Sequence, residues 1–265
     1  MCKLKLMVRH WMRQVIYSMI QFNNRKHRHI RITAPDLVMT AINLPVDGAL
    51  YRHEPKVTVT ASLVVAGDSF TEGSAASRIW RKFAIKVGRL LNIQNPLASG
   101  LGGTGYLKTI THYDGNERLN LLERVEDLYN PFGNDTRPDG IVFCMGINDS
   151  GLVVSDVAAA ARATFDAVRA VTTEVPLFIV GPWQANETYF TELATALEIE
   201  ATSTSNAYFI DNTGWISGTG NVNNIVGDGI ADWTQSADQT HPSDEGQDYL
   251  AHRLAAELRG VIRSL

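Results

Sequence analysis

The chain has 265 residues, of which 45% are hydrophobic and 20% are charged, and its formal net charge is −4 at pH 7. This length and composition predict a soluble globular protein with one sizeable hydrophobic core. The negative charge argues against a nucleic-acid-binding protein, and no apolar run reaches the ~20 residues of a membrane-spanning helix. Only two cysteines occur, Cys2 and Cys144, so a disulfide framework is excluded.

The first 28 residues form a strongly basic segment. Residues 1–31 contain eight Lys or Arg and no acidic residue, with apolar side chains interleaved among the cations. We interpret residues 1–28 as an N-terminal extension; the alternative is a segment that lies on an anionic membrane surface. Arg9, His10 and Arg13 interrupt any apolar core of a secretory signal peptide, so a cytoplasmic location is the default expectation.

Residues 29–60 have a different pattern. Three short runs of β-forming residues, at 29–33, 37–42 and 56–60, are separated by turns that contain proline. Such runs predict short, half-buried strands. We therefore expect a small β-rich N-terminal module that leads into a larger domain, residues 61–265.

In this larger domain, short apolar runs alternate with longer amphipathic segments. The apolar runs predict buried strands at 63–66, just before 99, and at 141–145, 177–180 and 208–211. The helical spacing of apolar residues predicts helices at 75–91, 119–128, 153–171, 188–201 and 245–262. Strands that alternate with helices favour a parallel sheet covered on both faces. The expected fold class is α/β: a three-layer α/β/α sandwich with a parallel flavodoxin-like sheet, plus a small N-terminal β appendage.

Chemically reactive residues follow the ends of these strands. The first strand runs into Gly67-Asp68-Ser69, which places a hydroxyl in the turn where parallel sheets bind ligands. A serine hydroxyl is a weak nucleophile, so it needs a base, a group that orients the base, and donors for the oxyanion. Asp238 precedes His241 by three residues, so one short loop can carry the base and its orienting carboxylate.

Four motifs occur in a defined order along the chain. Gly-Asp-Ser is followed by a glycine turn at 99–105, by Gly-Ile-Asn-Asp at 146–149 and by Asp-x-x-His-Pro at 238–242. This ordered set resembles the four sequence blocks of the SGNH (GDSL-type) hydrolases, over about residues 63–258. The resemblance implies a catalytic triad of a nucleophile, a general base and an orienting carboxylate: Ser69, His241 and Asp238.

The same resemblance assigns three donors to an oxyanion hole. Two are the backbone N–H of Ser69 and the side-chain amide of Asn148, and the third is a backbone N–H in the glycine turn. Matching Gly-Leu-Gly-Gly to the second block of the family selects Gly103, whereas counting from Asn95 selects Gly100. Both glycines stay open at this point.

The other acidic residues and the tryptophans have two interpretations each. We expect Asp68 and Asp149 to hold turns, and we expect no metal and no cofactor. The alternative is a metal site made of these two carboxylates with Asp238 and His241. Three tryptophans in or near loops are candidates for substrate binding and equally for ordinary packing: Trp183, Trp215 and Trp233.

The sequence thus predicts a serine ester hydrolase that forms an acyl-enzyme intermediate. The segments 181–186 and 212–239 are rich in Gly, Asn, Thr and Asp, which suits a short acyl group, acetyl first, and a carbohydrate or other small-molecule ester. One alternative is an acyltransferase that uses the same triad. Another is a catalytically silent module that binds carbohydrate or cell wall. The oligomeric state stays open.

Overall fold

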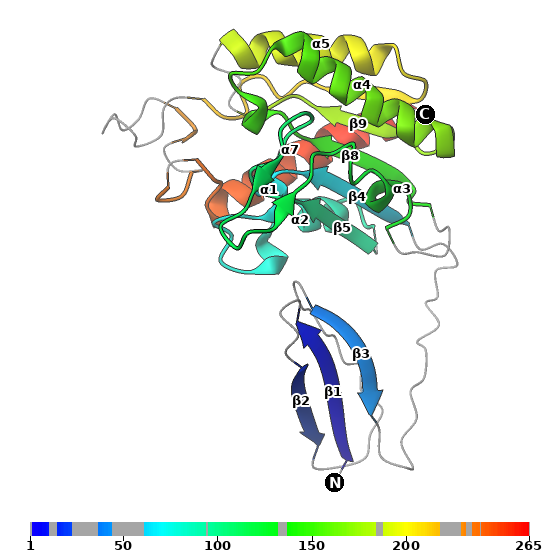
Figure 1. The fold of residues 1–265 in the computed structure, drawn as a ribbon, viewed down its shortest axis with the longest axis vertical. Helices are drawn as coiled ribbons and strands as arrows, with labels where there is room; N and C mark the ends of the chain where they lie inside the picture. The colour runs from blue at the N-terminus through cyan, green and yellow to red at the C-terminus, as the bar shows by residue number, and fades with distance from the viewer. Residues whose placement is uncertain are drawn as a thin grey trace. The chain divides into compact units, whose positions relative to one another are not determined.

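The computed structural model (Figure 1) divides the chain into two compact units, Met1–Thr58 and Val59–Leu265. In the first unit it describes the backbone of three strands. In the second unit it describes these residues with their side chains: 61–93, 95–131, 137–183, 188–217, 229–231, 235–238 and 240–264. None of the helices in these ranges is long and apolar enough to cross a membrane.

The first unit contains a three-stranded antiparallel sheet. Its strands, in the order β2-β1-β3, are β1 (Cys2–His10), β2 (Val15–Phe22) and β3 (Leu37–Asn43). The first two lie in the segment expected to be an extension, and the third lies in the expected β-rich module. The division between these segments at residue 28 stays a prediction. The strands expected at 29–33 and 56–60 lie outside the described residues.

The second unit is built on a five-stranded parallel sheet. Its strands are β4 (Ser62–Gly67), β5 (Asn95–Gly100), β8 (Gly140–Cys144), β9 (Leu177–Val180) and β10 (Ala207–Ile210). Their order across the sheet is β10-β9-β8-β4-β5, and every neighbouring pair is parallel. Of these five strands, the first in chain order, β4, therefore lies between the second and the third, which is the flavodoxin-like order. The expected α/β fold class is confirmed.

Helices cover both faces of this sheet, because consecutive residues of a strand point to opposite sides. The covering helices are α2 (Phe83–Leu90), α4 (Val154–Val171), α5 (Thr188–Thr202) and α7 (Asp244–Ile262). In β4, Leu63 and Val65 pack in the cluster that includes α2 and α7, whereas Val64 and Ala66 pack in the cluster that includes α4 and α5. Figure 1 shows α4 and α5 together on one side of the sheet. Burial on both faces explains why the three inner strands, β4, β8 and β9, are nearly continuous apolar runs.

The helix expected at 75–91 begins later than predicted. A single 3-10 turn, η1 (Ile79–Arg81), precedes α2, and Lys82 between them has a ψ of 131°, outside the helical region. The side chain of Gln247 accepts the Phe83 N–H at 2.7 Å, which satisfies a free donor at the start of α2. A partner on the C-terminal helix therefore determines where α2 starts.

The helix expected at 119–128 is wrong for most of its length. This segment forms consecutive turns, and only the short α3 (Glu126–Tyr129) is helical. Within the turns, Arg124 extends its side chain to backbone carbonyl groups at the ends of β4 and β5. Leucine spacing does not reveal such long-range contacts.

A short hairpin follows the glycine turn and was not predicted. It pairs β6 (Ile110–Thr111) with β7 (Glu117–Arg118). Its turn contains Asp114 and Gly115, and Gly115 has a φ of +81°. Asp-Gly is a favoured hairpin turn because glycine adopts positive φ at no steric cost, so a signal for this hairpin was present in the sequence.

Candidate active site

The expected nucleophile lies where β4 ends and the chain turns into a helix. A Cβ at Gly67 would lie 2.1 Å from Oγ1 of Thr71, so a larger residue does not fit where the chain folds back. Asp68 then caps the short helix α1 (Ser69–Glu72), because its Oδ1 accepts the Phe70 N–H at 2.9 Å. Ser69 is therefore the first residue of α1, at the carboxyl edge of the sheet.

The expected base and its orienting carboxylate come from one tight loop before α7. A backbone hydrogen bond from Ser236 to the carbonyl oxygen of His241, at 2.8 Å, closes this loop. Oδ1 of Asp238 accepts the backbone N–H groups of Thr240 (3.0 Å) and His241 (2.9 Å) and the Ser236 hydroxyl (2.8 Å). These contacts are local, so the Asp-x-x-His spacing itself determines the shape of the loop.

Ser69, His241 and Asp238 form a continuous hydrogen-bonded chain. Nε2 of His241 lies 2.8 Å from Oγ of Ser69, and Nδ1 lies 2.7 Å from Oδ2 of Asp238. Burial by itself raises the pKa of Asp238, but hydrogen bonds, first from the His241 side chain, outweigh it and hold this pKa well below its usual range. An ionised Asp238 accepts the Nδ1–H, which leaves Nε2 free to accept the serine proton.

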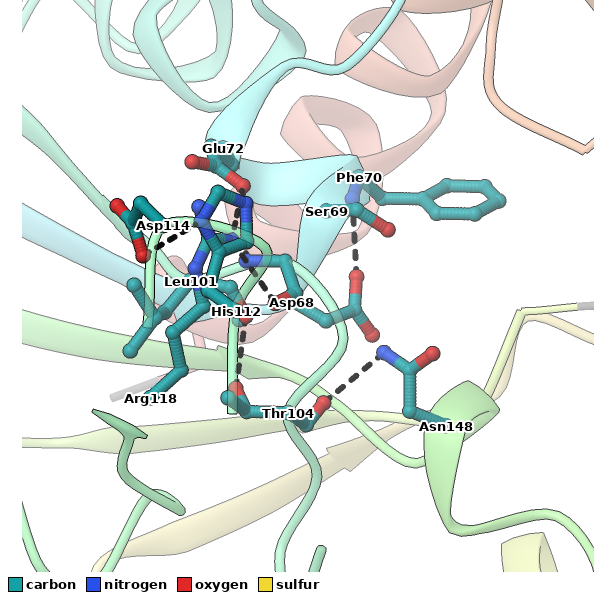
Figure 2. Close-up of polar contacts among 12 residues, drawn as sticks. Asp68, Ser69, Phe70, Glu72, Leu101, Thr104, His112, Asp114, Arg118 and Asn148 are labelled. Carbon is teal, nitrogen blue, oxygen red and sulfur yellow. Dashed lines mark hydrogen bonds and ion pairs between the residues drawn. The ribbon is translucent and has the colours of Figure 1, made fainter. Parts of the chain in front are cut away.

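The expected amide donor follows β8. Gly146, with a φ of 119°, turns the chain into the 3-10 turn η2 (Ile147–Asp149). Nδ2 of Asn148 donates to the carbonyl oxygen of Thr104 at 3.0 Å (Figure 2). A side-chain amide has two N–H groups, so this bond uses one and fixes the direction of the other. Since β4 and β8 are neighbours, Asn148 and Ser69 lie at the same switch point of the sheet.

The two glycines considered for the oxyanion hole have different environments. Gly100 is the last residue of β5, and a Cβ there would lie 1.9 Å from the backbone nitrogen of Glu72, so packing against α1 requires this glycine. Gly103 lies in the following loop with a φ of +82°, and its N–H has no acceptor among the described residues. Gly102, between them, donates its N–H to Oε2 of Glu72 at 2.8 Å.

Two buried carboxylates flank the site. Asp149 accepts the backbone N–H groups of Tyr106 (2.8 Å), Leu107 (3.2 Å) and Lys108 (3.0 Å), and it thereby holds the loop that follows the glycines. Oδ2 of Asp68 has no hydrogen-bond partner in the described part of the chain. Burial raises the pKa of Asp68 to about 7.

The alternative metal site is not formed. Across the described ranges, no three His, Cys, Asp or Glu side chains are grouped as metal ligands. The four residues considered have other contacts: the backbone donors for Asp149, the cap of α1 for Asp68, and each other for Asp238 and His241.

Two of the tryptophans considered as substrate contacts are buried, and the third lies outside the described residues. Trp183 and Trp215 are 1% and 4% exposed. The Trp183 ring stacks on Phe70 with centroids 5.8 Å apart and lies 6.3 Å from the Trp215 ring. Trp233 lies outside the described residues. Substrate binding by these three side chains stays a prediction.

Sequence reasoning missed Arg124, which ties the ends of two strands together. Its Nη2 donates to the carbonyl oxygen of Gly67 at 2.8 Å, and its Nη1 donates to the carbonyl and hydroxyl oxygens of Ser99, each at 3.0 Å. Burial lowers the pKa of this guanidinium to about 10. Arg124 thus links the ends of β4 and β5, and the end of β4 lies next to Ser69 in the chain. Its partners lie 25 and 57 positions away, so no local signal could reveal them.

A flavodoxin-like sheet with a serine, a histidine and an amide at its switch point is an arrangement found among ester hydrolases. Residues 65–260 match the family model described as "GDSL-like Lipase/Acylhydrolase family". The chain belongs to this family, which confirms the resemblance seen in the sequence and identifies the chain as an esterase. A search of the curated proteins finds no match.

Solved structures with a similar fold include two carbohydrate esterases of family 2. One, from Corynascus thermopiles (Myceliophthora fergusii), includes a carbohydrate-binding domain; it is 14% identical, with a TM-score of 0.59 over 98% of this chain and 87% of its own. The other, from Clostridium thermocellum in complex with cellohexaose, is 14% identical, with a TM-score of 0.59 over 100% and 87%. The esterase EstA from Pseudoalteromonas sp. is 12% identical, with a TM-score of 0.56 over 76% and 98%.

Proposed function

We propose that this esterase cleaves short-chain acyl esters, acetyl esters of carbohydrates first, with Ser69, His241 and Asp238 as its catalytic triad. The observation that carries the proposal is the unbroken hydrogen-bond chain from Asp238 through His241 to Ser69, with contacts of 2.7 and 2.8 Å. Both distances lie within the reach that proton transfer and orientation of the base require.

The chemistry follows from these contacts. Oγ of Ser69 attacks the ester carbonyl while Nε2 of His241 takes its proton, and ionised Asp238 stabilises the imidazolium that forms. The imidazolium returns the proton to the leaving alcohol, and the acyl group stays on Ser69. Water then attacks the acyl-enzyme with His241 again as the base, and the proton returns to Ser69 as the carboxylic acid departs.

Three N–H groups form the proposed oxyanion hole. They are the backbone N–H of Ser69, the backbone N–H of Gly103 and the Asn148 amide hydrogen that Thr104 does not bind. Gly103 is preferred over Gly100 because its N–H has no acceptor among the described residues. The close packing against α1 already explains why position 100 is a glycine. Charge that develops on the carbonyl oxygen would meet donors that are already oriented.

The proposed substrate class rests on composition and on the similar structures. A long acyl chain gains ~0.8 kcal/mol for each buried methylene only where a continuous apolar pocket receives it. The segments 181–186 and 212–239 are instead rich in Gly, Asn, Thr and Asp, whose polar groups suit a hydroxylated ligand. Two of the similar structures are carbohydrate esterases, which supports a sugar as the alcohol.

A fluorophosphonate probe tests the nucleophile. The intact protein should gain one probe mass, peptide mapping should place it on Ser69, and Ser69→Ala should abolish both the adduct and ester hydrolysis. Ser74→Ala, which changes a nearby serine outside the triad, is the matched control and should keep both. An adduct on another residue of the active protein would refute the assignment.

The substrate class needs a separate measurement. We expect kcat/KM for p-nitrophenyl esters to be greatest at C2 to C4, and acetate to be released from acetylated xylose or cellobiose. A maximum at C8 or longer would refute the short-acyl proposal. A C2 optimum without release of acetate from any acetylated sugar would refute the carbohydrate part alone.

The two alternatives from the sequence are decided in the same assays. An acyltransferase would transfer the acyl group to an added alcohol faster than to water, which product analysis with glycerol or glucose as acceptor measures. A silent binding module would hydrolyse none of the esters and would form no adduct at Ser69.

A further inference from the structure

A charged pair that the sequence analysis missed holds the loop beside the nucleophile. Oε2 of Glu72 accepts the Gly102 N–H at 2.8 Å, and Nη1 of Arg118 donates to the Gly102 carbonyl oxygen at 2.9 Å. The two side chains also bind each other, at 3.3 Å. Figure 2 shows Glu72 and Arg118 on one side of the loop 101–104 and Asn148 on the other. Both polar groups of Gly102 are thus bound by charged side chains.

The bond from Arg118 determines where the next N–H points. The carbonyl of Gly102 and the N–H of Gly103 belong to one peptide unit, which is planar and trans, so these two groups point in opposite directions. Because Arg118 holds the carbonyl, the Gly103 N–H is directed away from the ion pair. A cationic donor on the carbonyl also polarises the peptide, which makes its N–H a stronger donor.

This loop packs directly against the nucleophile. A Cβ placed on Gly102 would lie 3.3 Å from Cβ of Ser69, 2.5 Å from Oε2 of Glu72 and 3.0 Å from Nη1 of Arg118. A side chain at position 102 would therefore displace the pair. Glycine is required here so that the loop, the charged pair and the nucleophile fit together.

The other end of the loop is bound to the amide donor. The Thr104 hydroxyl donates to the carbonyl oxygen of Leu101 at 2.7 Å, and the Thr104 carbonyl accepts the Asn148 amide at 3.0 Å. One turn therefore carries the Gly103 N–H and holds Asn148. Its position is determined at one end by Glu72 and Arg118.

We propose that Glu72 and Arg118 are positioning residues of the oxyanion hole, which orient the Gly103 N–H and, through the loop, the Asn148 amide. This inference rests on the proposed function, in which Ser69 is the nucleophile. The side chains of Glu72 and Arg118 are 37% and 19% exposed, and they lie on elements of four and two residues. A partly exposed pair on such short elements contributes little to global stability, so its effect should fall on catalysis.

The main test is Arg118→Met, which keeps the side-chain length and removes the donor. With p-nitrophenyl acetate, kcat should fall by about 10-fold or more with KM within about twofold, because an oxyanion donor acts in the transition state. Arg118→Lys, which keeps a charged donor, should lose less. The matched control is Arg162→Met, since Arg162 is a partly exposed arginine paired with Asp166 on α4, and it should keep the wild-type kcat.

A second substrate separates positioning from general damage. Sulfur accepts hydrogen bonds weakly, so the oxyanion hole contributes less to hydrolysis of p-nitrophenyl thionoacetate than of the oxygen ester. The ratio of kcat/KM for ester over thionoester should therefore fall in Arg118→Met and, by a smaller factor, in Glu72→Gln, whose amide oxygen can still accept the Gly102 N–H. If Arg118→Met does not fold by circular dichroism, Arg118→Lys and Glu72→Gln provide the same comparison.

Two results would overturn the inference. One is a folded Arg118→Met variant with kcat within twofold of wild type; the other is an equal loss on ester and thionoester. Ser69→Ala, measured in parallel, separates the two proposals. If Ser69→Ala keeps wild-type activity, the proposed function itself fails. If it is inactive while Arg118→Met is unaffected, only the positioning role fails.

Discussion

The hydroxyl oxygen of Ser69 lies 2.8 Å from Nε2 of His241, although 172 positions separate the two residues in the chain. Ser69 starts α1 after the first strand of the parallel sheet, and His241 precedes the C-terminal helix. The contact therefore forms only when the whole domain is folded. A covalent probe at the serine consequently also reports that the domain is folded.

The base should matter more than the residue that orients it. We expect His241→Ala to lower kcat by about 10⁴-fold or more, and Asp238→Asn to retain more activity, because the asparagine oxygen can still accept the loop N–H groups that shape the turn. Steady-state kinetics on p-nitrophenyl acetate measures both, with Asp166→Asn as a control on an exposed helix face. An Asp238→Asn variant weaker than His241→Ala would contradict this order.

Loss of the amide donor should lower kcat and leave KM nearly unchanged. Asn148→Ala is expected to reduce kcat by about 100-fold, because its free amide hydrogen stabilises charge that develops only in the transition state. Asn148→Asp, which places a carboxylate near the developing oxyanion, should lose more. An unchanged kcat in Asn148→Ala would remove this residue from the oxyanion hole.

Asp68 should make the protein less stable as the pH rises. Burial raises its folded-state pKa to about 7, above the ~3.9 of an aspartate in an unfolded chain, so the unfolded chain releases this proton first. Between pH 5 and pH 8 this group should lower the free energy of unfolding by about 2 to 3 kcal/mol. Asp68→Asn retains an oxygen to cap α1 and should remove this decrease in the free energy of unfolding. Urea denaturation of both proteins at pH 5 and pH 8 measures the decrease, and an identical pH dependence in the two proteins would contradict the prediction.

Arg124 should contribute to stability through the strand ends that it joins. Arg124→Met removes the donors to the carbonyl oxygens of Gly67 and Ser99, and we expect the free energy of unfolding to fall by about 2 kcal/mol or more. Arg162→Met, at a partly exposed surface position, should change the free energy of unfolding by no more than about 0.5 kcal/mol. Equal unfolding midpoints for the two variants in urea would show that these contacts do not stabilise the sheet.

The three inner strands of the sheet could be predicted because they are buried on both faces. Such strands are uninterrupted apolar runs, and the structure places β9 at 177–180, where the sequence predicts it. The predicted helices at 153–171, 188–201 and 245–262 agree within one residue at each end, since each has a long apolar stripe that packs on the sheet. The helix predicted at 119–128 was wrong because the spacing of its leucines and charged residues resembles such a stripe. In the structure, Arg124 instead binds carbonyl groups at the ends of β4 and β5.

By itself, the sequence determined where most strands and helices lie, because their burial against the sheet leaves apolar runs and stripes along the chain. It also determined the loop in which Asp238 accepts the backbone N–H of His241, because that contact joins near neighbours. The other contacts of the candidate site are determined only by the tertiary structure. Ser69 contacts His241 across 172 positions of the chain. Glu72 and Arg118 bind Gly102 in the glycine loop from segments that are also distant in sequence. The direction of each of these side chains depends on how α1, the loop and the hairpin pack, and no spacing within the sequence encodes that packing.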